Sequence, residues 1–155
     1  MCKCGYPLQG MVHDLSKFSP TEFLSSARYF QGNRSPIEAE KDEVGYSAAW
    51  MHHKGHNPHH WEYWVDFDKN GEAIAARIPY KYVIEMMCDF VAAGITYNKE
   101  AWTQEEPINY FNKVRKGRHF HPETEHLICL YLTEIAKRGI DCTCELAKNK
   151  FYNYR

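Results

Sequence analysis

Histidines are concentrated in one short segment of the chain. Five of the nine histidines fall within the nine positions from His52 to His60. Imidazole is the commonest protein ligand for transition metals, so this density indicates metal binding rather than packing. A second candidate segment lies upstream, in His13-Asp14-Leu15-Ser16-Lys17. Together the two segments predict the two halves of a metal site.

The His13-Asp14 pair sets an imidazole beside a carboxylate. On a helix the two side chains point about 100° apart, so both can approach metal along the helix flank, and the carboxylate can bridge two ions. Lys17 follows on the same side, where its ammonium suits an anion, such as a phosphate, that the metal also holds. Taken alone, the pair also fits a structural dipeptide, with Lys17 as a solvated charge.

The histidine-rich segment is interrupted by Gly55 and Pro58, which break helices. We therefore expect His52 and His53 to end one helix, and His59-His60 to lie in the first turn of the next. Two helix ends that meet at a tight corner can direct imidazoles to one point, as a preorganised site requires.

The alternative for this segment is a histidine-rich surface loop. The Asn57-Pro58 helix start and the flanking Trp50, Trp61 and Trp64 argue against a mobile loop. His56 is the expected bystander among the five histidines.

Asp89 is the candidate carboxylate partner, because it lies in the most apolar stretch of the chain. An ionised carboxylate in such a helix needs a cation or strong hydrogen bonds. The alternative is a solvated stripe formed by Lys81, Glu85 and Asp89 at intervals of four residues. The sequence leaves both interpretations open.

Most of the remaining sequence predicts helices that would position these residues. Ser19-Pro20-Thr21-Glu22 and Ser35-Pro36-Ile37-Glu38 are helix starts, with Ser19 as the N-cap and Glu22 at the capping-box position. Helices are expected over 20–30, 36–54, 79–97, 101–116 and 122–138. Asp68-Lys69-Asn70-Gly71 predicts a hairpin turn. The expected fold is a single all-α helical domain over residues 1–155, with one small β-hairpin insertion near residues 65–79.

Composition narrows the functional class. The formal charge is −1, so there is no strong signal for nucleic-acid binding. No apolar run approaches the roughly 18 to 20 residues of a membrane span, and no signal peptide is recognisable. We expect a cytoplasmic protein without membrane contact, with its six cysteines reduced. The Cys2/Cys4 and Cys142/Cys144 spacing is too short for a common zinc motif, which favours ordinary thiols on mobile ends.

The order of these residues resembles the HD superfamily of helical metal-dependent phosphohydrolases. His13-Asp14, then His53, then His59-His60, then Asp89 resembles the expanded pattern of the HD-GYP phosphodiesterases. The wording around these residues is closer still to a family of uncharacterised HD-like proteins from bacteria and phages. The resemblance covers roughly residues 11 to 100 and rests on three segments: 13–23, 57–64 and 85–89.

The resemblance implies an HD-like helical bundle and a role for each matching residue. His13, Asp14 and Asp89 would hold one ion, with Asp14 bridging to a second ion on His53, His59 and His60. Asp14 and Lys17 would be the catalytic residues, with Lys17 on the scissile phosphate. One or two divalent transition metals (Mn, Fe, Co, Ni or Zn) suit such ligands and would activate a water for attack on phosphorus. The expected substrate is a small phosphorylated molecule, a nucleotide or related phosphoester.

The chain departs from the HD pattern at one position. HD enzymes take a first ligand from a histidine on a preceding helix, but the twelve residues before His13 include no histidine. Either the chain starts late relative to its relatives, or water, another residue or a partner chain fills that position. The N-terminal helix that would cover part of the core is then also expected to be missing, which makes a homodimer one expectation. The alternative function is a catalytically weak or inactive HD-like module that binds metal or ligand.

Overall fold

The computed structural model describes residues 1–32, 34–150, 152 and 154. About 70% of it is helical, with seven α-helices and one small antiparallel sheet in the described part. The elements are α1 (Pro7–Val12), α2 (Pro20–Tyr29), α3 (Pro36–Val44), α4 (Ala48–His56), β1 (Val65–Phe67), β2 (Ala73–Ala75), α5 (Tyr80–Asn98), α6 (Glu106–Val114) and α7 (Pro122–Lys148). The prediction of a mostly helical fold with a small hairpin is confirmed.

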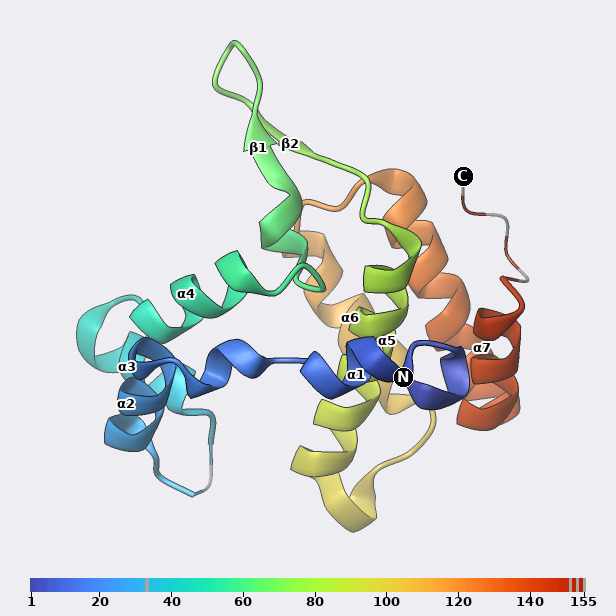
Figure 1. Cartoon of the computed structure of the whole chain (residues 1–155), viewed down its shortest axis with the longest axis horizontal. Helices are drawn as coiled ribbons and strands as arrows, with labels where there is room; N and C mark the ends of the chain where they lie inside the picture. Colours follow the sequence, from blue (N-terminus) through green and yellow to red (C-terminus); the bar gives the residue numbers. More distant parts are fainter. Residues whose placement is uncertain (33, 151, 153, 155) are drawn as a thin grey trace.

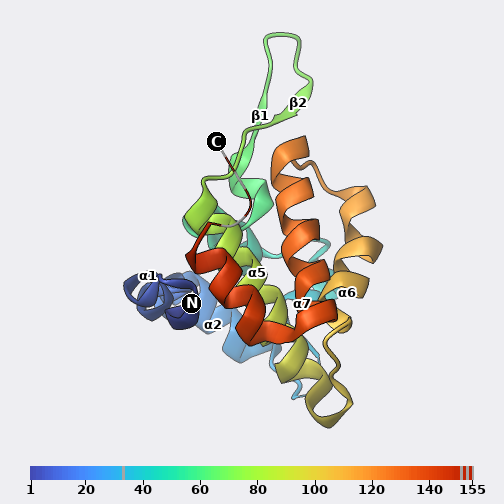
Figure 2. The ribbon, with the colours of Figure 1, turned by 90° about the vertical axis from the view of Figure 1, so that its right-hand side faces the viewer.

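The main core lies between α5, α6 and α7, which pack side by side in both views (Figures 1 and 2). The apolar run in α5 places Val83, Ile84 and Met87 against the apolar face of α7. Buried aromatic side chains complete this core, with Phe111 from α6 and Tyr131 from α7. The arrangement leaves the opposite face of α5 available for polar side chains.

A second group of helices, α2, α3 and α4, lies to one side of this core (Figure 1). It is joined to the core by α1 and by a short 3-10 helix, η2 (Leu15–Phe18). Ser19 caps α2 as predicted, because its Oγ accepts a hydrogen bond from the backbone N–H of Glu22. The candidate ligand segments lie where the two groups of helices meet.

The polar helix expected over 36–54 is wrong as a single helix. Gly45, at φ 86°, ends α3 in the left-handed conformation that favours glycine. Ser47 then begins α4, since its Oγ accepts a hydrogen bond of 2.9 Å from the backbone N–H of Trp50. Gly55 does not break α4, which runs to His56 and ends at the C-cap residue Asn57.

Two helices of the C-terminal half also differ from expectation. The helix expected over 101–116 is confined to α6, from Glu106 to Val114, with 3-10 turns on each side. The helix expected to end at residue 138 continues to Lys148 through a kink at Gly139, where φ is 84° and ψ 170°. Gly139 thus redirects the helix instead of ending it.

The hairpin forms where the turn residues predict it. Val65 pairs with Ala75 and Phe67 with Ala73. The Asp68 carboxylate accepts a hydrogen bond from the backbone N–H of Asn70, and Gly71 adopts a positive φ of 83°. The hairpin projects away from the helices (Figures 1 and 2).

The expectation that the thiols of Cys2, Cys4, Cys142 and Cys144 lie on mobile ends is wrong for two of these four residues. Cys4 and Cys144 are buried, and the Sγ atoms of Cys4 and Cys88 lie 3.9 Å apart in the core beneath the N-terminal segment. Cys2 and Cys142 are exposed. In each Cys-x-Cys pair, the first cysteine therefore faces the solvent and the second faces the core. Within the described residues, no helix combines the length and apolar character needed to cross a membrane.

The cap of α4 gives a test of the fold. Ser47 both caps α4 and donates a hydrogen bond to the buried Glu40 carboxylate. We expect Ser47→Ala to lower the free energy of unfolding by about 2 kcal/mol, because it removes a cap and leaves a buried carboxylate with one donor fewer. Urea denaturation measures this change.

Ser35→Ala is the matched control. Ser35 is the N-cap of α3 but makes no side-chain capping hydrogen bond. We expect it to change the unfolding free energy by less than about 0.5 kcal/mol. Equal losses in the two variants would contradict the role given to Ser47.

Candidate metal centre

Two overlapping groups of donor atoms lie where the two helical groups meet. Each group has four residues, whose candidate ligand atoms all lie within 4.8 Å of one another. The first group is Asp14, His53, His59 and His60, and the second is His13, Asp14, His59 and Asp89. All six residues predicted as ligands therefore fall in these groups, and three sequence segments supply them.

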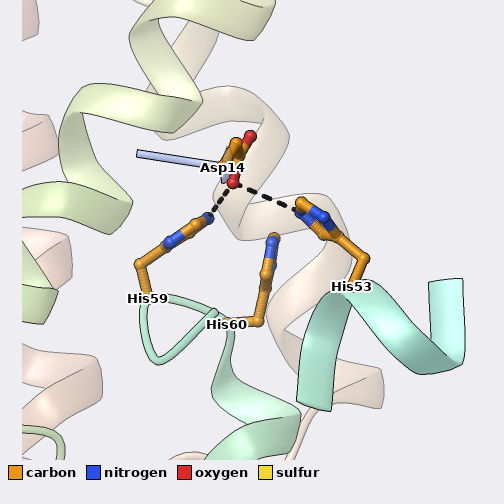
Figure 3. Close-up of side chains that lie close together, drawn as sticks. All are labelled: Asp14, His53, His59 and His60. Atoms are coloured by element: carbon orange, nitrogen blue, oxygen red, sulfur yellow. Dashed lines mark ion pairs between the residues drawn. The ribbon is translucent and has the colours of Figure 1, made fainter. Parts of the chain in front are cut away.

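Asp14 is the residue around which the first group is arranged (Figure 3). Its Oδ1 lies 3.4 Å from Nε2 of His53 and 3.5 Å from Nε2 of His59. Its other oxygen, Oδ2, lies 3.2 Å from Nε2 of His13 and 2.6 Å from Nζ of Lys17. The two carboxylate oxygens thus face different partners, as a bridging carboxylate requires.

The backbone at this pair differs from the expected helix. His13 ends α1 with extended backbone, and Asp14 adopts a left-handed conformation with φ 57° before η2 begins. Asp tolerates this region better than most non-glycine residues. The helical conformation is interrupted between α1 and η2. This interruption, rather than a helix flank, directs the side chains of His13 and Asp14 to the centre.

The histidine corner also has a local structure other than the one predicted. His53 lies in the last turn of α4 and is buried, whereas His59 and His60 lie in a turn before the 3-10 helix η3 (Trp61–Trp64), not in the first turn of an α-helix. The Asn57 side-chain amide donates a hydrogen bond of 2.8 Å to the carbonyl of His53. The backbone N–H of His60 donates to the carbonyl of Asn57 at 3.0 Å. These bonds fix the corner that aims three imidazoles at Asp14.

Three atoms of the first group are buried without a hydrogen-bond partner among the described residues. They are Oδ1 of Asp14, Nε2 of His59 and Nε2 of His60. An unpartnered buried polar atom costs about 1–3 kcal/mol of folding free energy. Three such atoms that face one another could be satisfied together by one bound cation. For ligand bonds of about 2.1 Å, tetrahedral geometry separates donor atoms by about 3.4 Å. The spacing around Asp14 Oδ1 fits a bound divalent ion.

Two buried glutamates orient the imidazoles, and sequence reasoning missed both. Glu22 accepts from Nδ1 of His52 at 2.7 Å and from Nδ1 of His53 at 2.8 Å. Glu85 lies 2.9 Å from Nδ1 of His13 and 3.5 Å from Nδ1 of His59. A carboxylate on Nδ1 leaves Nε2 free for a metal.

The sequence carried a partial signal for these glutamates. The spacing of Glu22 predicts a capping-box residue, but its side chain points into the protein instead of back to the start of α2. Glu85 lies one turn before Asp89 on the same face of α5. The solvated stripe considered for that face is wrong, because Glu85 is buried and paired.

The charges of the centre shift several pKa values. Hydrogen bonds with Asp14, Asp89 and Glu85 raise the pKa of His13 to about 11. Burial acts to raise the pKa of Asp14, but hydrogen bonds from His13 and Lys17 outweigh it and lower that pKa. Burial lowers the pKa of His60 to about 3. Without metal, His13 therefore carries the proton that an ion would displace, and His60 is neutral.

The other histidines lie outside both groups. His52 is held by Glu22 and stacks on His56, with ring centroids 3.9 Å apart. His56, the expected bystander, is exposed and contacts the carbonyl of His52. His121 caps α7, its Nδ1 accepting from the backbone N–H of Glu123.

A cavity of about 500 Å³ opens beside the metal centre. Its inner wall includes His59, His60 and Asp89. Aromatic side chains line much of the rest, namely Trp50, Trp61, Phe90, Tyr97 and Tyr110. Arg118 also lines the cavity, 5.9 Å from the rings of Phe90 and Tyr110. A molecule in this cavity would therefore lie against three candidate ligands.

Replacing Glu22 tests its orienting role. We expect Glu22→Gln to weaken the affinity for a divalent ion by about 10- to 100-fold, since the amide cannot hold both Nδ1 protons as the carboxylate does. Competition with a chromogenic chelator measures the affinity. Glu38→Gln, an exposed carboxylate paired with Lys41, is the control. Equal affinities in the two variants, with unchanged circular dichroism, would refute an orienting role for Glu22.

Metal content tests the centre directly. We expect protein purified without a histidine tag to carry at least one divalent transition ion per chain by elemental analysis. Removing the ion should destabilise the fold. Restoring free ion to 100-fold above Kd would return about 2.7 kcal/mol, or roughly 5 to 10 °C in Tm for a domain of this size. Protein that carries no transition metal, and whose Tm ignores all of Mn, Fe, Co, Ni and Zn, would exclude the site.

Comparison with known proteins places the chain in a family but assigns no activity. The model of a family of unknown function, DUF5662, matches residues 1–134, which include all six candidate ligands. No curated protein matches the chain. No solved structure matches it either. The chain therefore belongs to DUF5662, a family of unknown function.

Proposed function

We propose that the chain is a metal-dependent phosphohydrolase that acts on a nucleotide or a related phosphoester. The observation that carries this proposal is the pair of donor groups that share Asp14 and border one cavity. Two adjacent cation sites with a shared carboxylate suit the transfer of a phosphoryl group, because negative charge develops on several oxygens at once. The order of the ligands along the chain, which resembles the HD superfamily, supports the same reaction.

The residues of the centre would divide the work of holding metal. Asp14 would bridge, with His53 and His60 on one side and His13 and Asp89 on the other. His59 belongs to both groups, and its Nε2 would bind one of the two ions. This mixture of imidazole and carboxylate suits Mn, Fe, Co, Ni or Zn better than Mg. Bound metal would supply Lewis acidity that polarises the phosphoryl group and activates a water.

The absence of an upstream histidine does not leave the site short of donors. The group around His13 contains two imidazoles and two carboxylates, all from this chain. His59 provides the second imidazole of that group. A four-residue set is sufficient for a catalytic transition metal that keeps an open position. This composition favours an active enzyme over the alternative of an inactive binding module.

Lys17 is the residue best placed to hold the phosphate. Its ammonium lies 2.6 Å from Asp14 Oδ2, and its side chain is 62% exposed, so an incoming anion can reach it. Asp89 and Tyr97 lie close enough to act to raise the pKa of Lys17, and both line the cavity. In this proposal Lys17 would bind a phosphoryl oxygen and offset the negative charge that develops there in the transition state.

The cavity supports a substrate with a flat ring. Trp61, Phe90 and Tyr110 offer aromatic faces within a space of about 500 Å³. Stacking of a base on an aromatic side chain is worth about 1–3 kcal/mol. The phosphate would lie at the end formed by His59 and Asp89 and the ring among the aromatic side chains, which favours a nucleotide over a small aliphatic phosphoester.

The hydrolysis of nucleotides tests the proposal. We expect release of phosphate, or cleavage of a generic phosphodiester such as bis(p-nitrophenyl) phosphate, when Mn²⁺ is added. Asp14→Asn should abolish both metal binding and turnover. Lys17→Met should retain the metal but lower kcat/KM by about 100-fold, because it removes one charge from the transition state. His126→Ala, an exposed histidine outside the centre, is the control.

The pattern of results separates the alternatives. Metal-loaded protein that binds nucleotides but hydrolyses none of them would establish the inactive binding module. Hydrolysis that survives in Asp14→Asn would come from a contaminant or from another site, and the enzymatic proposal would fail.

A further inference from the structure

The N-terminal segment exposes an unusually apolar surface. Between Pro7 and Phe30, every exposed residue other than Lys17, Thr21 and Arg28 is apolar. We call its large members the N-terminal apolar face. They are Leu8, Met11, Val12, Leu15, Phe18, Phe23, Leu24 and Phe30. Figure 1 shows this segment as one continuous stretch that leads from α1 out to α2.

Helix α2 buries a charged side chain and exposes apolar ones, the reverse of a usual amphipathic helix. Its inner side packs on α3 and α4 and buries Glu22 and Tyr29. Its outer side carries Phe23, Leu24 and the small Ala27 at spacing that forms one helical stripe. A helix that presents an apolar stripe to solvent has its natural partner outside the chain.

The exposed area matches what a stable dimer needs. Phe18, Phe23 and Phe30 are 77%, 58% and 72% exposed. With the five aliphatic side chains they present on the order of 700 Å² of apolar surface. The largest patch on a typical monomer is about 300–600 Å², whereas a standard interface covers about 800 Å² on each partner. The face is therefore large enough to be an interface.

The charges at this face favour a second copy of the same chain. Its two cations are neutralised within the chain, since Lys17 pairs with Asp14 at 2.6 Å and Arg28 with Glu43 at 3.2 Å. A two-fold axis brings like surfaces together, so a self-associating face must not repel itself. An anionic membrane or an acidic partner would instead select unpaired cations, and this face offers none among its described residues.

We propose that two copies of the chain associate through the N-terminal apolar face to form a symmetric dimer. The inference goes beyond the proposed function and does not depend on it. Because His13 and Asp14 lie within the same segment, the second copy would lie next to the metal centre. The interface is made by the outer surfaces of α1, η2 and α2.

Sedimentation equilibrium of the full chain tests the dimer. The metal-loaded protein is used, and free metal is removed by gel filtration so that exposed histidines cannot bridge copies. We expect a mass of twice the 18.3 kDa chain, and a monomer for the double variant Phe23→Ser/Phe30→Ser. Phe67→Ser is the matched control, because Phe67 is equally exposed but lies on the hairpin. The control should remain dimeric.

A second variant keeps the test decisive if the double variant fails to fold. Ala27→Arg adds one exposed charge to the face without removing a packed side chain, and arginine is a good helix former. We expect it to remain folded by circular dichroism and to be monomeric.

A wild-type monomer at micromolar concentration, or a folded Ala27→Arg variant that is still dimeric, would overturn the proposal. Co-sedimentation of monomeric wild-type chain with vesicles of phosphatidylcholine and phosphatidylglycerol would also overturn it, by making a membrane the occupant. Neither measurement depends on hydrolysis.

Discussion

The buried charge of Asp14 is the constraint on which the rest of this structure depends. Its carboxylate is 8% exposed, and a carboxylate removed from water is stable only beside compensating groups. Four residues from two segments supply them: His13 and Lys17 flank it in the chain, and His53 and His59 approach from the histidine-rich segment. The core of α5, α6 and α7 supports one side of this meeting point, and α2 with α4 supports the other.

The compensation around Asp14 is incomplete in the protein alone. Lys17 and His13 satisfy Oδ2, whereas Oδ1 faces imidazole nitrogens without a hydrogen bond among the described residues. The two glutamates behind the imidazoles add further negative charge. Buried carboxylates of this number are unusual unless a cation joins them. The site could thus hold a cation in addition to Lys17 and His13.

The ligand set could be predicted because metal ligands are recognised by their residue types and by their order along the chain. The sequence predicts six ligands, and the structure brings all of them together: His13, Asp14, His53, His59, His60 and Asp89. The hairpin and the apolar helix α5 also followed from turn residues and composition. Whether these residues bind metal and act on phosphate remains a proposal.

The parts that escaped prediction depend on direction rather than on residue type. Glu22 fits a capping box by spacing, and only the packing of α2 on α4 turns its side chain to His53. The same rotation places Phe23 and Leu24 outside, although their spacing alone is compatible with a buried face. Asp14 was expected on a helix, because the residues around it do not indicate a positive φ at this aspartate. The split between α3 and α4 was missed because a single glycine is tolerated within a helical pattern, and only the positive φ of Gly45 shows that it ends α3.

The backbone at Asp14 offers a way to read the history of related chains. A left-handed conformation costs an L-residue about 1–2 kcal/mol, and glycine avoids that cost. Selection for stability alone would therefore replace Asp14 with glycine, and only selection for the carboxylate opposes the change. On the proposal of a metal centre, an aspartate retained at this position in a related chain would mark a lineage that still uses the centre, and a glycine would mark one that has abandoned it.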